Sequence, residues 1–99
     1  MTQTVTWRAA APTSHASRYL QQLCKHWSHR FEVQFDPTAG RIDLGDGVIC
    51  VLGATPARLD VELTAPADNA DRMKDVVEKH LRRFAHREPD MAFAWTADA

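Results

Sequence analysis

Three of the chain's five histidines and its single tyrosine occur in one segment, SHASRYLQQLCKHWSHRFEV, which begins at Ser14. Successive residues of a helix turn by about 100°, so positions 15, 19, 22, 26 and 29 share one side of a helix. His15 and His26 are eleven positions apart, or about 16 Å at the rise of a helix, which is too far for one metal ion. The segment therefore offers a partial site at most.

His26 and His29 have a spacing of three residues, at which two imidazoles on a helix can hold one transition metal ion, with bonds near ~2.1 Å for zinc. A third ligand would come from a later helix, where His80 and His86 are the histidines. The alternative is that both are solvated residues near a helix C-terminus, where positive charge is favoured. We prefer this alternative because the ligand set is incomplete. We predict no cofactor, and the binding of a metal ion stays an open alternative.

His80 stands in the middle of an apolar helical stripe. A buried imidazole needs a hydrogen-bond partner and is driven towards its neutral form. One interpretation makes it an acid/base group in a cleft, working with Tyr19 or Arg83. The other, which we prefer, makes it a core histidine bonded to a backbone carbonyl or to Tyr19.

His15 and Arg83 are the candidates for binding a small ligand. A guanidinium group binds carboxylate or phosphate through two parallel hydrogen bonds. More commonly such an arginine pairs with a nearby acid, here Glu88 or Asp90. Both interpretations of Arg83 stay open.

Composition excludes several classes of function. The chain has 99 residues with 12 Lys+Arg against 13 Asp+Glu, so no net field would recruit nucleic acid or an anionic membrane. No apolar run reaches the ~20 residues of a transmembrane helix, and we expect a cytoplasmic protein without a secretory signal. Cys24 and Cys50 are too few for a disulfide framework and fall on apolar faces, where a reactive thiolate is disfavoured.

The elements that must position these residues follow from hydrophobic periodicity. Alternation predicts strands over residues 2–10, 30–36, 41–44, 48–52, 58–64 and 91–95, with Asp46-Gly47 as a hairpin turn. Helical spacing predicts one helix capped by Thr13 or Ser14 and a second beginning near residue 68. The prediction is a single domain, 1–99, with an α+β fold: two helices on one face of a mostly antiparallel sheet, in the order β-α-β-β-β-β-α-β.

Four segments resemble the bacterial family catalogued as domain of unknown function 2218. They are HASRYLQQLCKHWSH, FDPTAGRIDLGDG, VVEKHLRRFAHRE and FAW, which together span nearly the whole chain. The resemblance implies a small single-domain cytoplasmic protein without an assigned activity. It also associates the family with siderophore-interacting reductases, either as neighbours or as a fused domain, which implies an iron-related accessory role.

Three hypotheses follow. The leading one is a non-catalytic binding or accessory module for a metal, a siderophore-related or other small ligand, or a protein partner. The second is a small enzyme that uses His80 with Tyr19 or Arg83. The third is a structural protein that acts as a homodimer.

Overall fold

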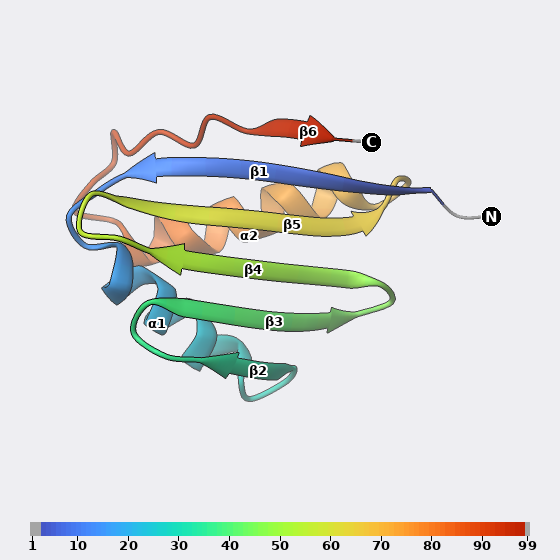
Figure 1. The fold of residues 1–99 in the computed structure, drawn as a ribbon, viewed down its shortest axis with the longest axis horizontal. Helices are drawn as coiled ribbons and strands as arrows, with labels where there is room; N and C mark the ends of the chain where they lie inside the picture. The colour runs from blue at the N-terminus through green and yellow to red at the C-terminus, as the bar shows by residue number, and fades with distance from the viewer. Residues whose placement is uncertain (1–2, 99) are drawn as a thin grey trace.

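The computed structural model describes residues 3–98, so Thr2 of the first predicted strand lies outside the described residues. The elements follow in the order β1 (Thr4–Pro12), α1 (Ala16–Trp27), β2 (Glu32–Phe35), β3 (Ala39–Gly45), β4 (Val48–Ala54), β5 (Arg58–Pro66), α2 (Ala70–Phe84) and β6 (Thr96–Asp98). All strands join one antiparallel sheet in the order β2-β3-β4-β5-β1-β6 (Figure 1). The predicted α+β fold and element order are confirmed.

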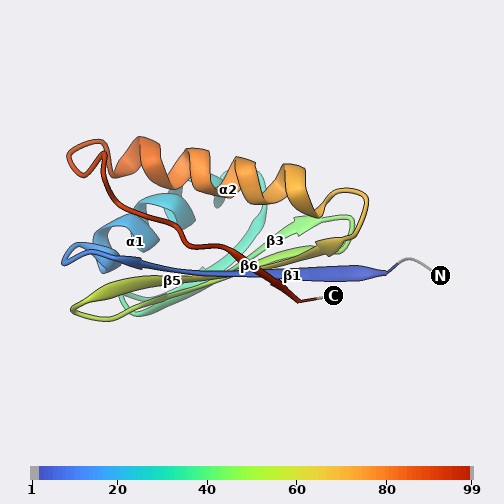
Figure 2. The same cartoon turned by 90° about the horizontal axis from the view of Figure 1, so that it is seen from above.

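Both helices lie on the same face of the sheet, and the opposite face is open (Figure 2). α1 packs on β2, β3 and β4, whereas α2 packs on β5 and β1. The inward side of α1 is the predicted apolar stripe: Ala16, Leu20, Leu23, Cys24 and Trp27 are all buried. These side chains meet the inward residues of the central strands, so one core lies between the helices and the sheet.

The β3–β4 connection is the predicted tight hairpin. Asp46 and Gly47 form a two-residue loop in which both have positive φ, 55° and 80°. Such a turn matches the right-handed twist of the paired strands, and Asp-Gly is among the sequences that adopt it at least cost. The hairpin belongs to a four-strand antiparallel meander from β2 to β5.

The last predicted strand was misplaced. Residues 91–95 do not pair with the sheet; pairing begins only at Thr96, where β6 lies beside Thr6, Trp7 and Arg8 of β1. Residues 91–95 instead run along α2, with Met91 buried. An extended segment that packs its alternate residues against a helix has the same two-residue period as a strand, so the pattern alone could not distinguish them.

The start of α1 also differs from the prediction. Its N-cap residue is His15, which makes no side-chain capping bond, rather than Thr13 or Ser14. The Thr13 hydroxyl accepts a hydrogen bond from the His15 N–H at 3.0 Å and donates to the carboxylate of Glu88. Thr13, which local propensity assigned to the cap, is therefore held by a tertiary contact with Glu88, in the segment that follows α2.

Within residues 3–98, neither helix has the length and apolar character needed to cross a bilayer.

Candidate functional site

The polar row expected along α1 is only partly present. His15, Gln22, His26 and His29 are exposed, but Tyr19 is buried, with 3% of its surface accessible. α1 ends at Trp27, so His29 lies in the following turn and does not continue the helix. The exposed row of the helix therefore runs through Arg18, Gln22 and His26, at intervals of four residues.

His26 meets His80 of α2, which the sequence offered both as an acid/base candidate and as a possible further ligand beside His26 and His29. The centroids of the two imidazole rings are 5.6 Å apart, and Phe84 lies edge-on to His26 at 5.9 Å. Between them these side chains join the last turn of α1 to the second half of α2. The structure thus pairs His26 with a histidine from the other helix.

His80 is half-buried, and its partner is the backbone carbonyl expected from the sequence. Its Nδ1 lies 2.8 Å from the Val76 oxygen, one helical turn earlier. A carbonyl oxygen can only accept, so Nδ1 carries the proton and Nε2 of the neutral ring keeps its lone pair. The ring also rests against Trp27, with 5.0 Å between centroids.

Tyr19 belongs to a separate cluster at the start of α1. Its hydroxyl donates to Glu88, which also accepts from the Thr13 hydroxyl at 2.8 and 3.0 Å. Burial raises the pKa of Tyr19 to about 12, and the bond to Glu88 and its negative charge act in the same direction. The hydrogen bond from Tyr19 in turn lowers the pKa of Glu88. This cluster links the start of α1 to the segment that follows α2.

The structure does not bring Tyr19 to His80. Tyr19 and His26 are seven positions apart in α1, which is about 10 Å along the helix axis, and His80 contacts the His26 end. Arg83 is exposed, and among the described residues it forms no ion pair with Glu88 or Asp90. The three side chains named as acid/base candidates are therefore not assembled around one hollow.

A small hollow opens where α1 faces the C-terminal end of α2. Its volume is about 220 Å³, and it is lined by Arg18, Tyr19, Gln22, Phe84, His86 and Arg87. We call it the basic hollow. Across residues 3–98, neither Arg18 nor Arg87 has an ion-pair partner. Glu88, which is bonded to Tyr19 of this wall, has both of its oxygens engaged by Tyr19 and Thr13.

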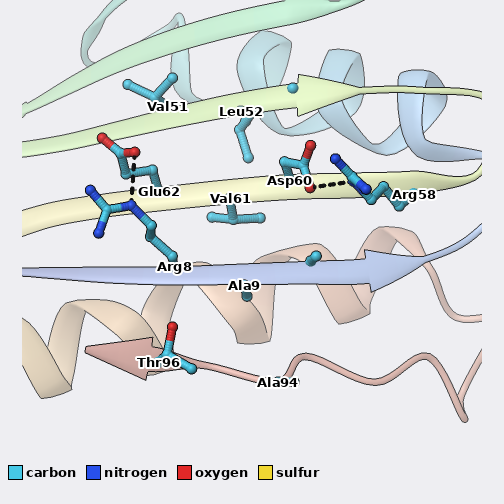
Figure 3. Close-up of a pocket in the computed structure, with 12 residues that line it drawn as sticks. Arg8, Ala9, Val51, Leu52, Arg58, Asp60, Val61, Glu62, Ala94 and Thr96 are labelled. Atoms are coloured by element: carbon cyan, nitrogen blue, oxygen red, sulfur yellow. Dashed lines mark hydrogen bonds and ion pairs between the residues drawn. The ribbon is translucent and has the colours of Figure 1, made fainter. Parts of the chain in front are cut away.

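A larger depression, of about 520 Å³, lies on the open face of the sheet over β4, β5 and β1. Its charged side chains are paired with one another: Arg8 Nε lies 3.3 Å from Glu62, and Arg58 Nε lies 2.9 Å from Asp60 (Figure 3). Arg8 also bonds Asp98 of β6. A wide, shallow surface with neutralised charges has the features of a solvated sheet face, and we favour the basic hollow as the site.

Both cysteines are buried, as predicted, on the inner side of α1 and of β4. Burial raises the pKa of Cys24 to about 11 and that of Cys50 to about 12, the latter with a further contribution from Cys24. Neither thiol is set up for nucleophilic chemistry. Over the described part of the chain, no three His, Cys, Asp or Glu side chains gather into a metal-binding group.

The sequence did not identify Arg18 or Arg87 as site residues. A signal for Arg18 was present, because Arg18, Gln22 and His26 follow one another at four-residue spacing on the exposed side of α1. Arg87 gave no local signal. It follows the last turn of α2, after the basic or histidine residues Lys79, His80, Arg82, Arg83 and His86. Only the packing of the two helices distinguishes Arg87 from them.

Comparison with known proteins identifies relatives but no activity. Residues 8–96 match the model of a family described as "Uncharacterized protein conserved in bacteria (DUF2218)". The NMR structure of PA4090 from Pseudomonas aeruginosa is similar, with a TM-score of 0.76 and 38% sequence identity over 97% of this chain and 96% of that chain. No curated protein matches the chain.

Proposed function

The chain belongs to the uncharacterised bacterial family DUF2218, as the resemblance predicted, and we propose that it is a non-catalytic module that binds a small oxyanion in the basic hollow. One observation carries the proposal: Arg18 and Arg87 flank one hollow, and neither has an ion-pair partner among the described residues. Guanidinium groups hold carboxylates and phosphates through paired, charge-assisted hydrogen bonds.

The size of the hollow limits the ligand. At about 220 Å³ it is smaller than the ~300–1,000 Å³ typical of sites for drug-sized molecules. It suits one phosphate or carboxylate group, with Gln22 as a further hydrogen-bond donor and the Phe84 ring as an apolar wall. The rest of a larger ligand would extend over the exposed surfaces of the helices.

Binding without catalysis fits the other candidate residues better than an enzyme does. The Tyr19 hydroxyl donates a hydrogen bond to Glu88, and the pKa of Tyr19 is about 12. Tyr19 is therefore a poor acid or base at neutral pH. His80 lines neither the basic hollow nor the depression on the sheet face, and its Nδ1 is engaged by a backbone carbonyl. The alternative of an enzyme using His80 with Tyr19 or Arg83 therefore has less support.

An NMR titration with inorganic phosphate, sulfate and succinate tests the proposal. At low ionic strength we expect saturable shifts confined to the amides and side chains around Arg18, Gln22 and Arg87. Chloride at matched ionic strength is the control for screening of exposed charges. Arg18→Ala and Arg87→Ala should each weaken binding about tenfold, the effect of ~1.4 kcal/mol.

Arg83→Ala is the matched control. Arg83 is an exposed arginine of α2 that does not line the hollow, and its loss should change the dissociation constant less than twofold. Equal losses in all three variants would indicate attraction by overall positive charge and would refute a defined site. Shifts centred on the sheet face would move the site to the larger depression.

The proposal also includes the partner and the location that the sequence predicts. We propose a cytoplasmic protein, in keeping with two buried free thiols, that acts as an accessory to a siderophore-interacting reductase. Calorimetry with the two purified proteins tests this pairing, and no heat of binding at 100 µM would refute it. A homodimer through an exposed edge strand or a helix face is the structural alternative, and light scattering across a concentration series distinguishes it from a monomer.

A further inference from the structure

The approach of His26 to His80 suggests a second site, which does not depend on the basic hollow. The sequence had paired His26 with His29, yet the structure places His29 beyond the end of α1 and brings a histidine of α2 beside His26. We propose that His26 and His80 together form an open two-histidine site for a borderline transition metal ion, such as Cu²⁺ or Zn²⁺.

The distance between the rings fits a shared metal. An imidazole nitrogen bonds such ions at about 2.0–2.1 Å, which puts the metal about 3.2 Å from each ring centroid. Two rings on one ion then have centroids about 5.2 Å apart at a tetrahedral angle and about 6.4 Å apart when the ligands are opposed. The observed separation of 5.6 Å lies within this range.

The hydrogen bonding of His80 prepares it as a ligand. Metal-binding histidines commonly donate their other ring N–H to a carbonyl or carboxylate, which fixes the tautomer and the orientation of the ring. The Val76 carbonyl takes this part here at 2.8 Å from Nδ1. Trp27, 5.0 Å away between centroids, packs on the same ring and restricts its rotation. Only Nε2 is left for a metal.

The surroundings define the kind of site. Within the described chain, no third His, Cys, Asp or Glu completes a ligand group, so at least two coordination positions would be taken by water or by an added ligand. Imidazole suits copper, nickel and zinc, and affinity for a given nitrogen site rises to a maximum at copper. We therefore expect Cu²⁺ to bind more tightly than Zn²⁺, at a site that remains open to solvent.

The test is a titration of tag-free protein with Cu²⁺, followed by electron paramagnetic resonance, and with Zn²⁺, followed by the ring shifts of the histidines. We expect saturation at one ion per chain, with shifts for His26 and His80. His26→Ala and His80→Ala should each lower the affinity at least tenfold. His26 is exposed, so its variant should keep the fold even if the half-buried position 80 proves sensitive.

His29→Ala is the matched control, since it is the neighbouring histidine that the sequence favoured, and it should change the affinity less than twofold. The proposal is overturned if no ion binds below 1 mM, if His26→Ala leaves the affinity unchanged, or if His29→Ala lowers it as much as His26→Ala does. Arg18→Ala and Arg87→Ala should leave metal affinity within twofold, so failure of the anion site and of the metal site can be distinguished.

Discussion

Two regions next to α2 differ in whether their charged side chains have partners within the fold. On the side towards the C-terminal segment, charged residues at four-residue spacing each engage an aromatic ring or its N–H; we call this set the clasp. It comprises Lys74, Glu78 and Arg82 with Trp7, Trp95 and Phe93. Just beyond the C-terminal end of α2, next to α1, Arg87 has no ion-pair partner among the described residues, and neither has Arg18 across the hollow.

Glu78 is the centre of the clasp. It accepts a hydrogen bond from the Trp95 indole at 2.6 Å and another from the Arg82 guanidinium at 2.8 Å. Arg82 also donates to the Met91 carbonyl and lies 5.0 Å from the centroid of Phe93. Both Glu78 and Arg82 are engaged by groups of the C-terminal segment, so these contacts explain why residues 91–95 follow the helix rather than the sheet. The Trp7 indole N–H, by contrast, is buried without a hydrogen-bond partner among the described residues.

The contrast indicates what each region is for. Charges whose partners lie inside the fold contribute to stability and leave no capacity for a ligand. Charges held next to one another without such partners contribute little to stability and are available to bind from solution. Substitutions in the clasp should therefore change stability, whereas substitution of the two arginines of the basic hollow should change binding.

The largest effect is expected from Trp95→Ala. It removes the stacking on Phe93 and the hydrogen bond to Glu78. A buried Trp→Ala change costs about 3–5 kcal/mol, and Trp95 is half-buried, so we expect a loss of about 2–3 kcal/mol in the free energy of unfolding by urea. Trp95→Phe keeps the stacking and should lose about 1 kcal/mol. A loss below 0.5 kcal/mol for Trp95→Ala would show that the clasp is not structural.

The next largest effect is expected from Tyr19→Phe. It should lower the free energy of unfolding by about 1–1.5 kcal/mol, because Glu88 keeps only the Thr13 hydroxyl as a side-chain donor. The folded protein holds the phenol in its neutral form, with a pKa raised from 10.0 to about 12, chiefly by burial. This contribution is complete below pH 10 and is lost as pH rises towards 12. Unfolding curves between pH 9 and 12 should fall more steeply for the wild type than for the variant.

Glu78→Gln tests the charge at the centre of the clasp and should cost about 1 kcal/mol at pH 7. Burial acts to raise the pKa of Glu78, but hydrogen bonds from Arg82 and Trp95, together with the positive charges of Arg82 and Lys74, outweigh it, and the net shift is downward. Because the pKa of Glu78 is lower in the folded protein than in the unfolded chain, its ionised carboxylate stabilises the fold at pH values above the unfolded pKa near 4.5. This stabilisation is lost as the pH falls below that value.

The variant should accordingly lose less stability than the wild type between pH 5 and 3, measured by thermal unfolding. Glu62→Gln, in an exposed ion pair with Arg8, is the comparison and should change stability by less than about 0.5 kcal/mol. An equal effect of the two changes would remove the distinction between the clasp and the sheet face.

The smallest effect on stability is expected from the double substitution Arg18→Ala and Arg87→Ala. Two neighbouring positive charges without partners repel one another, so their removal should change the free energy of unfolding by less than about 0.5 kcal/mol. The same protein should lose phosphate binding. A large destabilisation would mean that these arginines support the fold and would weaken the proposed site.

The fold was predictable because hydrophobic periodicity is a local property. The stripe from Ala16 to Trp27 could bury itself only as a helix, and the alternation of Leu59, Val61 and Leu63 only as a strand with one wet face; all of these side chains are buried. Asp46-Gly47 specified its turn through backbone conformation alone. The prediction was wrong where a local pattern served a tertiary contact, at Thr13 and at residues 91–95.

The candidate residues were predictable by type but not by partner. His26 and His80 were both identified as histidines of interest, 54 positions apart in the chain, but nothing in their spacing relates them. Tyr19 was placed on the polar side because position 19 shares one side of the helix with positions 15, 22 and 26. The structure buries it, with its hydroxyl bonded to Glu88.

The sequence by itself determined the secondary structure, the inner faces and the inert character of the two cysteines, because each follows from periodicity and burial within one element. The tertiary structure alone decided which histidines meet, which charges are paired and where a hollow is left. The angle and register at which α1 and α2 pack on the sheet set these distances, and they depend on the fit of side chains across the whole core. That fit made Glu78 part of the framework and left Arg18 and Arg87 facing an open hollow.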